Sequence, residues 1–144
     1  GAPGSLTLRT LLEDFSDVVD QIPIAGGGQA PGNIDEALRY GVAAELTLLS
    51  APLGWAGGRL SLNGQFYDSR VRDPLGGFLR TISDEDWVTV QARFRQDFAA
   101  TPYAAGLNLT YEKDAPSYFL EEISRRRQRF GYITVFAEHK DVLG

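Results

Sequence analysis

The sequence predicts an all-β protein in which about six antiparallel strands follow one another in an up-and-down meander. Apolar and polar residues alternate along several segments, with the period of two that is typical of a β-strand. Glycine (16 of 144 residues) and aromatic residues (11%) are abundant, and Cys and Met are absent, a composition that favours β structure. The connections between these segments are short and long in turn. This rhythm predicts hairpins with tight turns at one end of the sheet and long loops at the other.

A single β domain over residues 6–144 fits the length of the chain. Residues 1–5, GAPGS, resemble a cloning remnant and are set apart from that domain.

The first segment of the domain fits two interpretations. It begins as a strand, with Leu6 and Leu8 on one side. However, its apolar residues also follow helical spacing, and Ser5 could cap such a helix. The residues with helical spacing are Leu8, Leu11, Leu12, Phe15, Val18, Val19 and Ile22. By spacing alone, a short helix within residues 6–20 is slightly favoured over a strand.

The later strands alternate more clearly. They are expected near residues 40–48, 59–67, 88–95, 103–111 and 130–140. The short turns are expected at 50–58 and 98–102, and the long polar loops near 21–35, 71–85 and 113–128. The sequences of the hairpins do not repeat, so the rhythm is architectural.

Alternation alone leaves open which face of the strands lies inside. In a soluble barrel the apolar face points inward, whereas in an outer-membrane barrel it faces lipid and the polar face lines a wet lumen. Two groups of aromatic residues favour the membrane barrel. Trp55, Phe98 and Tyr103 lie near the short turns, and Phe66, Tyr67, Trp87 and Tyr111 are expected near the long loops. The polar face carries Arg59, Asn63, Gln65, Gln91, Arg93 and Asn108, which suit a wet lumen.

Composition excludes several other functions. The net charge of −5 and the pI of about 4.8 argue against binding to nucleic acid or to anionic membrane surfaces by charge alone. The lack of Cys removes disulfides, thiolate metal sites and thiol catalysis. No apolar run approaches the ~18 residues that a membrane-spanning helix needs.

Four stretches, taken in their order and spacing, resemble the C-terminal barrel half of a TonB-dependent outer-membrane receptor. They are GNIDEALRYGVAAELTLL, GGRLSLNGQFYDSRVRDPLGG, FRQDF and FAEHKDVLG. The resemblance covers most of residues 6–144, and it makes residues 6–20 a strand. It implies a barrel segment that forms scaffold and loop surface of a receptor importing a scarce ligand across the outer membrane of a Gram-negative bacterium.

The same resemblance implies the partners. They are a plug and further barrel strands that this sequence does not show, outer-membrane lipid or lipopolysaccharide, and TonB through an N-terminal region. Without plug and TonB-contacting box, the segment is not expected to transport by itself. Free strand edges could also pair with another copy of the chain, or the strands could close on themselves. The alternative hypothesis is a soluble up-and-down barrel that binds a small apolar ligand.

Candidate ligand-binding residues lie on the expected lumen face and in one loop. The lumen residues are Arg59, Gln65, Arg93 and Arg95. In the receptor interpretation, the run SRRRQR places Arg125, Arg126 and Arg127 at a loop top. Their guanidinium groups could meet lipopolysaccharide phosphates or an anionic ligand there.

The sequence predicts neither an enzyme nor a cofactor or metal site. His139 is the only histidine, and no spacing pairs it with a nucleophile. Asp84, Glu85 and Asp86 lack the pattern of a calcium loop. The Gly-rich run at 25–32 lacks the Lys-Ser/Thr of a phosphate cradle and is expected to be a flexible loop. Asp68 and Asp73 are interpreted as charge pairs at the base of a loop.

Overall fold

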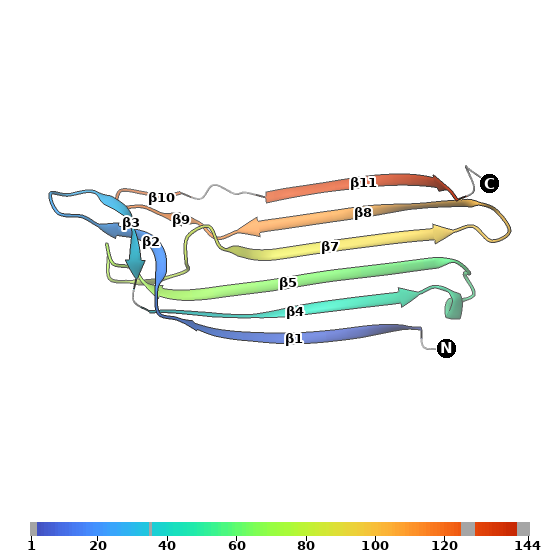
Figure 1. Cartoon of the computed structure of the whole chain (residues 1–144), viewed down its shortest axis with the longest axis horizontal. Helices are drawn as coiled ribbons and strands as arrows, with labels where there is room; N and C mark the ends of the chain where they lie inside the picture. Colours follow the sequence, from blue (N-terminus) through green and yellow to red (C-terminus); the bar gives the residue numbers. More distant parts are fainter. Residues whose placement is uncertain (1–2, 35, 125–128, 141–144) are drawn as a thin grey trace.

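Six long strands form one antiparallel sheet in the computed structural model, which describes residues 3–34, 36–124 and 129–140. Their bounds are β1 (Gly4–Phe15), β4 (Ala37–Leu49), β5 (Gly58–Arg72), β7 (Asp86–Asp97), β8 (Tyr103–Asp114) and β11 (Arg129–His139). Their order in the sheet, β1-β4-β5-β7-β8-β11, is their order in the sequence (Figure 1). The predicted all-β meander is therefore confirmed.

The sheet is open. Within the described residues, β1 pairs with β4 alone and β11 pairs with β8 alone. The self-closed barrel, one of the two forms expected from the sequence, is therefore not formed by the described strands; that the open sheet is part of a larger barrel stays a prediction.

The two ends of the sheet differ in their connections. At one end, a short turn with a 3₁₀ segment η1 (Ala51–Leu53) and the turn at 98–102 join neighbouring strands. The other end carries the long connections, which hold further short strands (Figure 1). These are β2 (Val18–Pro23) paired with β3 (Gln29–Ile34), β6 (Leu79–Arg80) paired with β5, and β9 (Ser117–Tyr118) paired with β10 (Ile123–Ser124). No helix among the described residues is long and apolar enough to span a membrane.

The helix that spacing favours within residues 6–20 is wrong. Residues Gly4–Phe15 form strand β1, in which Leu8 pairs with Ala44 and Leu12 pairs with Tyr40. The apolar residues mimic helical spacing because both faces of β1 carry some of them. Phe15 lies on the opposite face from Leu12 and packs against a small buried cluster at the long-loop end. Gly4 and Ser5 also belong to β1, although their sequence had set them apart from the domain.

One face of the sheet is apolar and uncovered. Register and alternation place on it ten exposed large hydrophobic residues: Leu6, Leu8, Leu12, Leu38, Val42, Leu48, Phe66, Leu107, Ile133 and Val135. On β4 this face is apolar or aromatic from Leu38 to Leu48, about 34 Å at ~3.4 Å per residue. Beyond Tyr40 the neighbouring positions turn polar, with Asp14 and Arg70.

Of the two expected groups of aromatic residues, the structure places the first at its end of the sheet but not all of the second. Trp55, Phe98 and Tyr103 lie exposed at the short-turn end. However, Phe66 and Tyr67 lie inside β5, which continues to Arg72, rather than beside a long loop. Tyr67 is paired with Gly41 on the polar face. The expected position of Phe66 and Tyr67 near a long loop was wrong because the sequence gives no signal that β5 extends five residues past Tyr67.

The buried core is small. Its one cluster among the described residues consists of Ile34, Ala37 and Val71, with Phe15, Val18, Ile22 and Ile82 packed around it, and Ala104 and Ala115 are buried elsewhere. The chain exposes 9797 Å² of surface, whereas a compact monomer of this mass exposes about 7,300 Å². The long strands are thus held mainly by their backbone ladders, and no described segment of the chain covers either broad face of the sheet.

Candidate functional site

The polar face of the sheet carries the residues that the sequence singled out as ligand-binding. Successive cross-strand rows bring side chains of neighbouring strands together on this face. Arg59 lies opposite Arg95, and Ser61 lies opposite Arg93. The next rows hold Asn63 opposite Gln91 and Gln65 opposite Thr89. Because directly opposed residues lie about 5 Å apart between Cβ atoms, each row forms one local surface.

Arg59, Arg93 and Arg95 surround one recess. Together with Ser61 they line a hollow of about 340 Å³ near the short-turn end of β5 and β7. Gln65 lies farther along the face, in a separate groove of about 410 Å³ whose lining includes Asn63, Tyr67 and Gln91. The structure therefore brings together three of the predicted lumen residues and places the fourth in a neighbouring groove. Arg125, Arg126 and Arg127 lie outside the described residues.

The arginines around the recess differ in their partners. Arg95 Nη1 donates to Glu138 Oε2 at 2.6 Å, and Arg95 Nη2 donates to Asp97 Oδ1 at 3.2 Å. Asp97 also pairs with Lys140. Arg93 stacks its guanidinium over the ring of Phe136, 5.8 Å from the centroid.

Two glycines on the polar face support aromatic side chains. Tyr67 lies over Gly41, and Phe136 lies over Gly106, each pair being directly opposed across two strands. A Cβ atom built on Gly41 would lie 2.3 Å from Tyr67 Cδ1, and one on Gly106 would lie 2.7 Å from Phe136 Cζ. Only glycine therefore lets these rings lie flat on the neighbouring strand.

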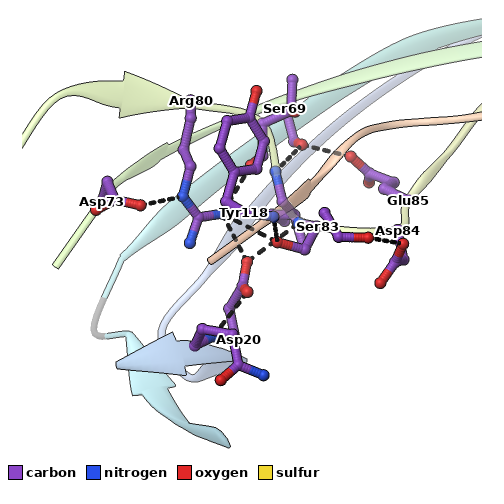
Figure 2. A network of polar contacts seen from close by, with 12 residues as sticks. Asp20, Ser69, Asp73, Arg80, Ser83, Asp84, Glu85 and Tyr118 are labelled. Atoms are coloured by element: carbon purple, nitrogen blue, oxygen red, sulfur yellow. Dashed lines mark hydrogen bonds and ion pairs between the residues drawn. The ribbon is translucent and has the colours of Figure 1, made fainter. Parts of the chain in front are cut away.

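A second polar site lies at the long-loop end and is centred on Arg80 (Figure 2). Arg80 Nη1 donates to Asp20 Oδ2 at 2.7 Å, and Arg80 Nε donates to Asp73 Oδ2 at 2.5 Å. The three side chains are 1–3% exposed. Tyr118 covers the guanidinium, with 4.7 Å from Arg80 Cζ to the ring centroid. This network joins the β2–β3 hairpin, the turn after β5, β6 and β9.

The carboxylates of this network are held by further hydrogen bonds. Asp73 Oδ1 accepts from the backbone N–H groups of Leu75 and Gly76, which closes the turn. Asp20 accepts from the backbone N–H groups of Ser83 and Gln21. Burial would raise the pKa of Asp20, but the hydrogen bonds from Arg80, Ser83 and Gln21 outweigh burial and hold it below its usual value of 3.8. Burial would lower the pKa of Arg80, yet its two carboxylate partners hold it above the usual value.

A neighbouring set of contacts fastens the loops to the strands. Ser69 donates its hydroxyl hydrogen to Glu85 and accepts a hydrogen bond from the N–H of Ile82 at 3.0 Å. Glu85 also lies 3.5 Å from Arg39 Nη1, and Arg39 Nε donates to Glu13 at 2.7 Å. The chain of contacts therefore runs from β1 through β4 and β5 to the loop before β7.

Arg80 and Asp20 were missed as interacting residues by reasoning from the sequence. Asp73 had been assigned to charge pairing at a loop base, and its pair with Arg80 agrees with this. Asp20 lies 60 positions from Arg80, and no local pattern marks either residue as buried. The only sequence signal was the turn chemistry of Asp73-Pro74 and Gly76-Gly77.

The remaining candidates have structural contacts. His139 lies at the end of β11, edge-on to Tyr103 at 4.8 Å between ring centroids. Asp84 accepts a hydrogen bond from Ser117, and Asp68 accepts one from Tyr40. In the described part of the chain, no group of three or more His, Cys, Asp or Glu side chains is arranged to hold a metal ion. The loop expected for the Gly-rich run 25–32 is only partly correct: residues 25–28 form the turn of the β2–β3 hairpin, where Gly26, Gly27 and Gly28 have positive φ, and residues 29–32 pair within strand β3.

Comparisons with protein-family models, with curated proteins and with solved structures find no match to this chain. The receptor resemblance therefore stays a prediction.

Proposed function

We propose that this chain is a segment of the wall of an outer-membrane β-barrel, of the TonB-dependent receptor type, that imports a scarce ligand. In this role the apolar face contacts lipid and the polar face lines the lumen. The chain contributes scaffold and loop surface and carries out neither catalysis nor transport alone. Its partners are the remaining strands of the barrel, a plug, and outer-membrane lipid or lipopolysaccharide.

The observation that carries this proposal is the uncovered apolar face. Ten large hydrophobic side chains lie exposed on one face of a single sheet, and contiguous exposed apolar surface of this kind marks contact with a membrane or a partner. The apolar stretch on β4 is about 34 Å long. At the ~40° tilt of strands in outer-membrane barrels it would span about 26 Å across the membrane, close to the ~25 Å height of their lipid-facing band.

Two further observations support it. The opposite face carries arginine, asparagine and glutamine side chains in shallow hollows, as suits a water-filled interior. The connections are short at one end of the sheet and long at the other. This matches the short periplasmic turns and long extracellular loops of such barrels, and it assigns the Arg80 network to the extracellular side.

The alternative of a soluble barrel around an apolar ligand finds less support. It requires the apolar face to enclose a cavity, but the described strands form an open sheet with that face exposed. The hollows that include Arg59 and Gln65 lie on the polar face instead.

Size-exclusion chromatography with light scattering, with and without detergent, tests the membrane part of the proposal. We expect aggregation in buffer alone, and a monodisperse, β-rich species by circular dichroism in micelles. A monodisperse β-rich monomer without detergent would contradict it, because the apolar face would then have to be covered within the chain.

Uptake measurements test the receptor part. Cells in which the reading frame that encodes this chain is disrupted should lose uptake of one scarce ligand among a panel of metal chelates, cofactors and oligosaccharides. Uptake restored by the intact frame would support the receptor assignment. Unchanged uptake of every ligand in a panel that the unmodified strain imports through TonB would contradict it.

A further inference from the structure

We propose that the recess lined by Arg59, Ser61, Arg93 and Arg95 binds an oxyanion, a phosphate or a carboxylate group. This inference deepens the proposed function, on which it rests for the assignment of the polar face to the lumen. It names the chemistry of the group that this part of the lumen wall would hold.

Charge is the first reason. The recess and the ion pairs beside it hold four cationic side chains, those of Arg59, Arg93, Arg95 and Lys140. Their carboxylate partners are Asp97 and Glu138. Counting the described residues alone, two positive charges remain uncompensated at one place on a chain whose net charge is −5.

The state of Arg59 is the second reason. It lies directly opposite Arg95, and like charges in this position repel each other. Among the described residues, the side chain of Arg59 has no ion pair and no hydrogen bond. The hydroxyl group of Ser61 has no hydrogen bond either. Arg95 already has two carboxylate partners, so an anion in the recess would give Arg59 a partner of opposite charge and would also accept a hydrogen bond from the Ser61 hydroxyl.

The other arginines on the polar face provide the contrast. Arg9 is paired with Glu45, and Arg39 is paired with Glu13. Each of these two arginines has an acidic partner, whereas Arg59 and the stacked Arg93 have none within residues 3–34, 36–124 and 129–140. Guanidinium groups bind phosphate and carboxylate through paired N–H donors, so a cluster of them with a neighbouring hydroxyl is suited to an oxyanion.

Titration of the ¹⁵N-labelled full chain in micelles of an uncharged detergent tests the proposal. Inorganic phosphate and citrate are added separately at low ionic strength, and the amide signals of Ser61 and Gly106 are followed by NMR. We expect saturable shifts. A tighter response to phosphate would identify a phosphate group as the ligand chemistry, and a tighter response to citrate a carboxylate group.

Arg59→Gln should weaken binding about tenfold, because a charge-assisted contact is lost. Arg70→Gln is the matched control. Arg70 lies on the same strand and its loss changes the net charge equally, but it belongs to the apolar-face positions near the long loops, over the ring of Tyr40. It should change the affinity by less than about twofold.

Absence of saturable shifts with both anions would overturn the proposal, as would equal weakening by the two variants, which would indicate attraction by net charge alone. Insertion of the same chain into lipid vesicles, measured separately, distinguishes the two proposals. Insertion without anion binding would contradict only the oxyanion site. Binding without insertion would support the oxyanion site and contradict only the membrane wall.

Discussion

At the scale of single residues, the side chain most dependent on its partners is Arg80. Its guanidinium is buried between Asp20 and Asp73, so removing it leaves two carboxylates in a site that water does not reach. Breaking a buried ion pair in this way is strongly destabilising, because the remaining charge is uncompensated. The network fixes the β2–β3 hairpin and the turn after β5 to each other.

Arg80→Met should therefore destabilise the loop end by about 3–5 kcal/mol. Native-state hydrogen exchange in micelles should show the loss in β2, β3 and β6, with the middle of β7 and β8 unaffected. Arg72→Met is the matched control, because Arg72 is exposed and donates only to the carbonyl of Gly77. Equal loss of protection in both variants would show that the ion network does not hold the loops.

The low pKa of Asp20 gives the loop end a pH dependence. Because the pKa is lower in the folded chain than the usual 3.8, its stabilisation is complete above that value. It is lost as the pH falls through the folded pKa. Exchange protection of the β2–β3 hairpin should therefore decrease below about pH 4. In Asp20→Asn this decrease should shrink. Protection that rises with falling pH would contradict the assignment.

At the scale of elements, the glycine–aromatic pairs determine how closely neighbouring strands approach on the polar face. A side chain on Gly106 would meet both the ring of Phe136 and the backbone oxygen of Phe94, the latter at 2.2 Å from a Cβ. The backbone oxygen cannot move aside as a flexible side chain can.

Gly106→Val should therefore destabilise the β7–β8–β11 part of the sheet by about 1–3 kcal/mol, as overpacking does. Denaturant unfolding of the chain in micelles, followed by circular dichroism, measures this loss. Gly64→Val is the control, because a Cβ at Gly64 meets nothing within 4 Å. A loss at Gly64 as large as that at Gly106 would contradict the packing role.

Alternation of apolar and polar residues predicts a strand only where one side of the strand is apolar and the other is polar. Strands β4, β5, β7, β8 and β11 were predictable because one side of each is consistently apolar. Strand β1 was ambiguous because Leu11 and Phe15 add apolar residues to its other side. The short strands in the long connections were missed, since two-residue strands such as β6 and β9 are too short to show a period.

The two polar sites differ in how far the sequence predicts them. Arg59, Arg93 and Arg95 could be predicted to share a face, because period two fixes the side of a strand on which each residue lies. Their meeting at one recess needed the register of β5 with β7. The Arg80 network could not be predicted, because it joins loops whose arrangement depends on contacts between distant segments.

At the scale of the whole molecule, the two faces of the sheet are proposed to have different surroundings, lipid at the apolar face and water at the polar face. In the part of the chain that the structure describes, the sheet has an exposed apolar face, a polar face with hollows and unpaired edges at β1 and β11, features that in water favour association with other surfaces. As the wall of a membrane barrel, the same sheet has lipid on one side, water on the other and further strands at its edges.

The most direct test uses two neighbouring residues of β5, since the chain contains no Cys that would compete for a label. Leu62→Cys and Asn63→Cys, each carrying a polarity-sensitive fluorophore, are placed in lipid vesicles that contain a quencher attached to the acyl chains. Because adjacent residues of a strand point to opposite faces, the label at Leu62 should be quenched by lipid, and the label at Asn63 by a water-soluble quencher. Equal quenching at both positions, or lipid quenching at Asn63 alone, would contradict the assignment of the apolar face to lipid.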